Sequence, residues 1–403
     1  MIYDIIIIGG GISGLYSAYL IKKYYPKKTF LILEQNKKKY IGGRIHTEIF
    51  NGVEVVCGAG IGRKDKDILL MNLLKELNLK YKEFIVKKEY ADTFKGKIDI
   101  ISIVKKLKEE YNKNKEFYNN YTFKKFSEKI LGKKLYKNFV ETNGYSDFEK
   151  EDVYNTLYNY GFEDNLSEWV ALSIPWRKMI DKLINIIDIK NIKTLTKVNK
   201  IYSSNNLINI NTENGNEYKS NKIIIGVTVN SIIKLLNNNI YNQIGGQSFL
   251  RVYGKFSKSS INIINIKNIK NTTIVGGLIY KIICINAEKG IYMICYNDNN
   301  AADILSKYIQ NNNKNKLFWC NMIEKSLGIK KDTLKLINIK GFYWNIGTHY
   351  YKPLENKYKN IKEFIKIAQN PYPNIYVVGE MVSTNQGWTE GALESVKKII
   401  KDI

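Results

Sequence analysis

IYDIIIIGGGISG, residues 2–14, is the stretch that decides the fold of this chain. Residues 2–8 are mostly apolar and rich in isoleucine, which predicts a buried parallel strand. Apolar residues then recur at helical spacing from Ile12, and Pro26 lies just beyond the predicted end of that helix. Residues 29–34 predict a second strand, so the chain opens with a βαβ unit.

The turn between the first strand and the helix has the glycine spacing Gly9-x-Gly11-x-x-Gly14. Gly9 allows a tight turn, Gly11 lets a pyrophosphate approach the backbone, and Gly14 lets the helix pack on the sheet. The helix N-terminus donates N–H groups to the phosphates, and Glu34 at the tip of the second strand can accept the ribose hydroxyls. We expect a dinucleotide to contact Gly9, Gly11, Ile12, Ser13, Gly14 and Glu34. The glycines alone do not distinguish NAD from FAD.

Two further motifs indicate the type of dinucleotide protein. Gly42-Gly43-Arg44 follows Glu34 closely, and Gly379-Glu380 precedes QGWTEGALES, residues 386–395. Together with the opening turn, these motifs resemble those of the FAD-dependent amine oxidases and their relatives. The resemblance implies an α/β fold in which a Rossmann-type FAD-binding domain is interleaved with an α+β substrate domain.

The two expected domains alternate along the sequence. We expect residues 1–62, 191–236 and 360–403 to form the FAD-binding domain, and residues 63–190 and 237–359 to form the substrate domain. Spacing of apolar residues predicts a mainly helical region over residues 65–190. The strand predictions, which include a hairpin at Asn214-Gly215, cover residues 193–227, 261–266, 278–285, 291–296 and 375–378, and helices are predicted over 301–309 and 389–400.

The resemblance also implies which residues bind FAD. Arg44 would lie beside the diphosphate, where a fixed cation offsets the phosphate charge. The last helix, from Thr389, would direct its N-terminus at the flavin pyrimidine carbonyl. The residues implied by the resemblance are Gly42, Gly43, Arg44, Gly60, Ile61, Val198, Trp344, Gly379, Glu380, Trp388 and Thr389. Some proteins that this chain resembles attach the flavin covalently through a cysteine in the C-terminal third of the chain. No cysteine lies beyond Cys320 here, so the resemblance implies FAD that is bound non-covalently.

Aromatic residues near the C-terminus bear on the substrate. Trp388 stands where the family has one aromatic residue of a cage beside the flavin, and Tyr351 or Tyr350 stands near the second position. Two aromatic faces guide an amine toward the flavin and attract a cation. The alternative is that these residues, among 30 tyrosines in the chain, are ordinary core aromatics.

One residue departs from the family pattern. Members commonly have a lysine that is bridged by water to flavin N5, and here Arg251 stands at that position. An alignment shifted by four residues would place Lys255 there instead. Arginine stays charged and carries no proton in a catalytic cycle, but it can bind a carboxylate or stabilise negative charge. We expect the catalytic residues to be Arg251, Trp388 and Tyr351.

The function implied is that of an FAD-dependent oxidase of an amine. Hydride passes from the amine α-carbon to flavin N5, and O2 is the acceptor, giving an imine that hydrolyses to an aldehyde, and H2O2. Alternatives are another flavin redox enzyme of this fold, such as an amino-acid oxidase or a desaturase, and a non-catalytic FAD-holding protein. Arg251 would favour a substrate that bears a carboxylate.

Composition limits the remaining classes. Only two histidines are present, which excludes zinc sites built on several histidines, and we expect no metal. The net charge of +25 comes with abundant Lys, Asn, Ile and Tyr, a pattern typical of A/T-rich codons, and no nucleic-acid motif accompanies it, so nucleic acid is not an expected partner. Four scattered cysteines, no secretory signal and no long apolar run favour a soluble, cytoplasmic protein without a membrane span.

Overall fold

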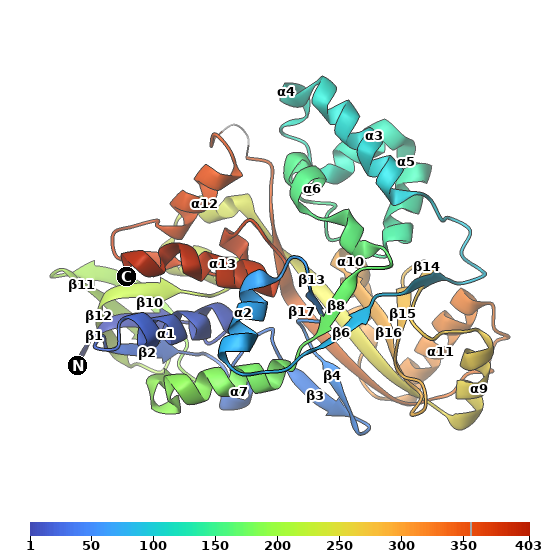
Figure 1. Ribbon diagram of the computed structural model, residues 1–403, viewed down its shortest axis with the longest axis horizontal. Coiled ribbons are helices and arrows are strands. Elements are labelled where there is room, and N and C mark those ends of the chain that lie inside the picture. The colour runs from blue at the N-terminus through green and yellow to red at the C-terminus, as the bar shows by residue number, and fades with distance from the viewer. Residues whose placement is uncertain (355–356) are drawn as a thin grey trace.

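The computed structural model describes residues 1–354 and 357–403 of the 403-residue chain. Two large sheets lie side by side, and a separate group of helices, α3 to α6, stands above them (Figure 1). Both chain ends lie beside the first sheet. None of the helices within the described ranges combines the length and apolar character that crossing a membrane requires.

The first sheet has seven strands and contains the predicted βαβ unit. Its order is β10-β11-β12-β1-β2-β9, and β18 pairs with β12. β1, β2, β9, β12 and β18 are joined by parallel pairings, whereas the hairpin of β10 and β11 is antiparallel. The strands are β1 (Ile2–Ile8), β2 (Phe30–Leu33), β9 (Ile192–Lys193), β10 (Val198–Ser204), β11 (Leu207–Thr212), β12 (Glu217–Ile225) and β18 (Ile375–Val377).

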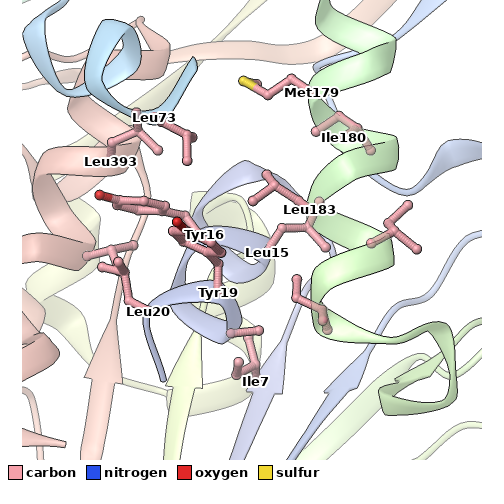
Figure 2. Close-up of a cluster of buried hydrophobic side chains, with 14 of the residues drawn as sticks. Ile7, Leu15, Tyr16, Tyr19, Leu20, Leu73, Met179, Ile180, Leu183 and Leu393 are labelled. Carbon is pink, nitrogen blue, oxygen red and sulfur yellow. The ribbon is translucent and has the colours of Figure 1, made fainter. Parts of the chain in front are cut away.

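Four helices bury one shared core on this sheet. They are α1 (Ile12–Tyr24), α2 (Ile68–Glu76), α7 (Trp176–Ile187) and α13 (Thr389–Ile399). Figure 2 shows Leu15 and Tyr16 of α1 facing Leu183 of α7 and Leu393 of α13. α2 and α7 therefore pack with the dinucleotide unit, although their sequences fall in the range 63–190 that we expected in the substrate domain. We propose that both helices belong to the FAD-binding domain.

The second sheet is built around two long antiparallel strands, β13 (Ile244–Phe256) and β17 (Leu336–Tyr351). Its order is β17-β13-β16-β15-β14-β7. The other strands are β16 (Ile291–Asp298), β15 (Tyr280–Asn286), β14 (Thr272–Gly276) and β7 (Lys88–Tyr90). One face of the sheet packs on α9 (Lys258–Ile266), α10 (Asn299–Leu305) and α11 (Asn313–Leu327), which bury residues such as Trp319. The opposite face is free to line a cavity.

The helical group has an aromatic core of its own. Its helices are α3 (Ile100–Lys113), α4 (Lys115–Tyr118), α5 (Phe123–Asn143) and α6 (Val153–Asn159). Phe123, Phe139, Phe148 and Phe162 contact one another at ring-centroid distances of 5.2 to 6.0 Å. α5 is kinked at Gly132, whose φ is 76°.

The remaining elements connect these three parts. They are β3 (Thr47–Phe50), β4 (Val53–Val56), β5 (Gly62–Arg63), β6 (Lys82–Ile85), β8 (Val170–Ser173), α8 (Val229–Leu236), α12 (Ile361–Gln369) and the short 3-10 helices η1 (Lys38–Tyr40), η2 (Phe162–Asn165), η3 (Ile189–Asn191), η4 (Asn239–Gln243), η5 (Ser306–Tyr308), η6 (Glu380–Val382) and η7 (Ile400–Asp402). β3 and β4 form a hairpin, and β5, β8 and β6 form a three-stranded sheet.

One predicted strand is wrong. Residues 261–266 belong to helix α9, which begins at Lys258. The Ser257 side chain accepts a hydrogen bond from the amide of Ser260, which caps the helix. Ile264 is buried in the core of the second sheet, so tertiary packing outweighs the strand preference of the isoleucines.

Candidate functional site

One cavity of about 1260 Å³ connects the glycine turn after β1 with the free face of the second sheet. This volume exceeds the roughly 300–1,000 Å³ of an ordinary small-molecule site, which leaves room for an extended cofactor together with a substrate. The predicted residues that line it are Gly9, Gly11, Ile12, Ser13, Glu34, Gly42, Gly43, Arg44, Gly60, Ile61, Val198, Arg251, Trp344, Gly379, Glu380, Trp388 and Thr389. Gly14 and Tyr351 are not part of the lining.

The glycine turn is shaped to hold a ligand. A Cβ atom at Gly14 would lie 2.0 Å from the Gly9 carbonyl oxygen, so Gly14 is needed for close packing of α1 on β1. A Cβ atom at Gly11 would meet no atom within 4 Å. No side chain caps the N-terminus of α1, and its first turn has no acidic residue. These features fit a pyrophosphate group at Gly11, held by the N–H groups of α1.

Glu34 is held in a fixed orientation at the end of β2. Its Oε2 atom accepts a hydrogen bond of 2.7 Å from the Gly10 amide. Its Oε1 atom accepts from the backbone and side-chain nitrogens of Asn36, at 2.7 and 2.9 Å. Three of the roughly four acceptor sites of the carboxylate are thus used, and Oε2 keeps one for a ribose hydroxyl of a dinucleotide.

Arg44, which is partly exposed, and the buried residues Glu380 and His349 form a cluster that joins three distant segments. Arg44 contacts Glu380 at 2.9 Å and donates to the Gly347 carbonyl oxygen at 2.8 Å. The Val229 amide donates to His349 Nε2, so Nδ1 carries the proton and donates to Glu380 at 2.5 Å. Burial by itself raises the pKa of Glu380, but His349, Arg44 and hydrogen bonding lower it to about 2.

His349 is a functional candidate that the sequence reasoning missed. Glu380 stays ionised at every ordinary pH, and this anion fixes Arg44 at the cavity wall. Two features of the sequence could have identified His349: it is one of only two histidines, and it lies in the segment that also contains Trp344.

Trp388 lies directly before helix α13, and its surroundings differ from an open aromatic cage. Its indole Nε1 donates to Asp67 at 2.7 Å, and the Arg63 guanidinium carbon lies 4.6 Å from its ring centroid. Arg63 is in turn paired with Asp67 at 2.8 Å and with Asp164 at 3.1 Å. One face of the tryptophan is thus covered by a guanidinium whose charge two carboxylates neutralise, and no motif predicted this arrangement.

The expected cavity role of Tyr351 is wrong. Tyr351 is fully buried, its ring lies 5.5 Å from that of Phe364, and its hydroxyl donates to the Ser383 carbonyl oxygen. Its neighbour Tyr350 lines the cavity, because adjacent residues of a strand point to opposite faces. Trp344 lines the cavity as expected, and its indole donates to the Cys57 carbonyl oxygen at 2.7 Å.

Arg251, and not Lys255, faces the cavity. Arg251 lies beside Gly60, where an added Cβ atom would be 3.1 Å from the guanidinium Nη2. Lys255 lies outside the lining and donates to the Lys289 carbonyl oxygen. Of these two residues, Arg251 is therefore the one that we propose acts on a bound ligand.

Three further ionisable residues, Lys88, Asp147 and Lys281, line the cavity, and the buried Asp298 acts on Lys281 from outside the lining. Lys281 donates to the Gly144 carbonyl oxygen at 2.7 Å, and its pKa is lowered well below the usual value, chiefly by burial. Burial also lowers the pKa of Lys88 to about 7 and raises that of Asp298 to about 7. Asp147 has a raised pKa through burial as well. No motif in the sequence pointed to these residues.

His46, Glu48 and Cys57 place their potential ligand atoms within 4.8 Å of one another. Glu48 is paired with Lys340 at 3.0 Å, so a cation already occupies part of this cluster. We assign it no metal.

Comparisons with known proteins agree with this geometry. Residues 7–77 match the family of NAD(P)-binding Rossmann-like domains. The whole chain superimposes on a triple mutant of putrescine oxidase with redesigned cofactor binding, with a TM-score of 0.75, 12% identity and coverage of 99% of this chain and 98% of that one. The chain has the fold of putrescine oxidase. A double mutant of the same enzyme gives a TM-score of 0.72 at 12% identity, covering 100% of this chain and 99% of that one.

A relative by sequence is the uncharacterized protein R188 of Acanthamoeba polyphaga mimivirus. It is 21% identical, over 98% of this chain and 93% of its own length. The fold expected from the resemblance to flavin amine oxidases, a mixed α/β fold with a Rossmann-like dinucleotide-binding part, is confirmed.

Proposed function

We propose that this protein is an FAD-dependent oxidoreductase that oxidises an amine with O2. The observation that carries the proposal is the single cavity that joins the glycine turn, Glu34 and Arg44 to Gly60, Trp388 and the start of α13. Bound there, FAD would supply the redox chemistry of an overall reaction in which an amine and O2 give an imine, then an aldehyde, and H2O2.

The chain supplies binding and orientation. Gly11 and the α1 N-terminus hold the diphosphate, and Glu34 holds the ribose. The N-terminus of α13 has no side-chain cap, so its N–H groups are available to a flavin carbonyl and stabilise negative charge there. Trp388 and Trp344, which both line the cavity, would position the substrate beside the flavin.

The test is anaerobic mixing of the FAD-loaded protein with a panel of amines. Loss of the visible absorbance of the oxidised flavin is the expected result with at least one amine. Readmission of O2 should restore the colour and produce H2O2. If the protein holds FAD tightly and no amine or amino acid bleaches it, the oxidase function is wrong, and the non-catalytic alternative takes its place.

A further inference from the structure

Two buried cations, on β13 and β15, flank the same strand of the second sheet, β16. Arg251 on β13 pairs in register with Tyr296 on β16, and its guanidinium carbon lies 4.2 Å from the centroid of that tyrosine ring. Lys281 on β15 lies 4.6 Å from the same centroid. Arg251 is 6% exposed and Lys281 is 1% exposed, and both line the cavity.

The two cations differ in what neutralises them. The carboxyl groups of Asp298 and Asp147 act on Lys281, and its ammonium also donates to the Gly144 carbonyl oxygen. The groups that act on Arg251 are tyrosines, chiefly Tyr296 and Tyr253. Within the described part of the chain, no ion pair includes Arg251.

Arg63 provides an internal comparison. It too lines the cavity with its guanidinium against an aromatic ring, but it is paired with both Asp67 and Asp164. An unpaired buried charge costs several kcal/mol, so buried arginines normally have such partners. Arg251 has no carboxylate partner among the described residues, and it faces the cavity beside Gly60, one of the residues expected to contact FAD.

We propose that the substrate itself supplies the missing anion: it is an amino acid, whose carboxylate pairs with the Arg251 guanidinium. This inference rests on the proposed function. A planar guanidinium binds a carboxylate through two parallel hydrogen bonds, which a lysine cannot do. The α-carbon that loses hydride then bears the carboxylate, the nitrogen lone pair forms the C=N bond, and hydrolysis of the imine releases a 2-oxo acid and ammonia. O2 accepts the two electrons and two protons to give H2O2.

The first experiment compares amino acids with their decarboxylated amines on the FAD-loaded protein. Suitable pairs are phenylalanine with phenethylamine, and ornithine with putrescine. The amino acid should reduce the flavin about 10- to 100-fold faster, the factor expected for a charge-assisted pair. Arg251→Met should lose most of this preference, Arg251→Lys should retain part of it, and Lys106→Gln, which removes one exposed charge on α3, should keep it.

The second experiment measures binding without turnover. Benzoate is titrated into the oxidised FAD-loaded protein, and the change in the flavin absorbance spectrum gives the dissociation constant. We expect binding to the wild type and to Lys106→Gln, and binding at least tenfold weaker to Arg251→Met. The FAD content of each variant, from the ratio of flavin to protein absorbance, checks that it is folded and loaded.

The outcomes separate the two proposals. If amines reduce the flavin as fast as amino acids, or if Arg251→Met slows both to the same extent, Arg251 serves the flavin and the carboxylate site is wrong. If neither class reduces the flavin, the oxidase function is wrong, and benzoate binding decides the carboxylate site alone. Equal benzoate affinity in the wild type and Arg251→Met contradicts the site in either case.

Discussion

Two glycines of the same turn have different proposed roles: Gly14 is needed for folding and Gly11 for FAD binding. Gly11→Ala adds a methyl group that meets no protein atom, so stability should be unchanged while FAD binding weakens tenfold or more, about 1.4 kcal/mol. Gly14→Ala places its methyl group against the Gly9 carbonyl and should lower the free energy of unfolding by about 1–3 kcal/mol. Urea denaturation of both apoproteins and fluorescence titration with FAD measure the two effects. A destabilised Gly11→Ala apoprotein would contradict this division.

Arg251 should lower the free energy of unfolding of the protein. Its guanidinium is buried without a carboxylate, so Arg251→Met should raise the free energy of unfolding by about 1 kcal/mol or more, although a contact with the Tyr296 ring is lost. Urea denaturation in excess FAD measures this, with Lys106→Gln as the variant that also loses one charge. A less stable Arg251→Met protein would show that the surrounding tyrosines fully compensate for the cost of burying the Arg251 charge.

Residues in motifs were predictable from the sequence, and residues that depend on tertiary packing were not. The glycine turn, Glu34 and Arg44 line the cavity because short-range spacing determines their positions. The choice between Tyr350 and Tyr351 depends on which face of β17 is inward, and the register of β13 against β17 shifts between Gln247 and Phe249. That irregularity has no signal in the sequence.

At the scale of elements, the start of α6 should make stability depend on pH. Glu151 precedes this helix and accepts hydrogen bonds from Asn155 and Thr156. Burial, with a smaller contribution from the neighbouring acids, raises the pKa of Glu151 from 4.5 to about 8. The folded protein therefore keeps a proton that the unfolded chain loses above pH 4.5, and stability falls as the pH rises toward 8.

Glu151→Gln should remove this dependence. One such group changes the free energy of unfolding by at most about 1.4 kcal/mol per pH unit. The free energy of unfolding of Glu151→Gln, relative to that of the wild type, should therefore rise steadily between pH 5 and pH 8. Denaturation in urea at four pH values measures the difference. A difference between the two proteins that does not change with pH would mean that Glu151 is ionised in the folded state.

Elements were predictable where one pattern continued for a whole strand or helix. β1, α1, the hairpin of β11 and β12, and α13 all follow clear periodicity and lie where expected. The predicted helical range 65–190 also contains the short strands β6, β7 and β8, each of four residues or fewer. Strands of that length are fixed by their partners, because they contain too few residues for an alternating pattern.

At the scale of the whole molecule, FAD should be bound without a covalent link and should stabilise the entire fold. Acid precipitation should leave all of the flavin in the supernatant, whereas a yellow pellet would contradict non-covalent binding. Because segments from the start, middle and end of the chain line the cavity, FAD at 100 times its dissociation constant should add about 2.7 kcal/mol to the free energy of unfolding. Thermal denaturation with and without FAD measures this.

The interleaved architecture was predictable because its markers stand at both ends of the chain. The glycine turn near residue 9 and the Gly379-Glu380 motif belong to one sheet, which requires the chain to return to it. Packing of α2 and α7 on α1 was not predictable, because the sequence of an apolar helix face does not indicate which of the two domains it packs against.

β13 and β17 bury side chains in the cores of both halves of the molecule. Ile244 and Tyr351 pack beneath the first sheet, and Leu250 and Ile339 pack in the second. A continuous antiparallel ribbon therefore crosses from one half to the other, and bending it would break hydrogen bonds and open two interiors at once. We therefore expect the two halves to keep their relative position while substrate enters and product leaves the cavity.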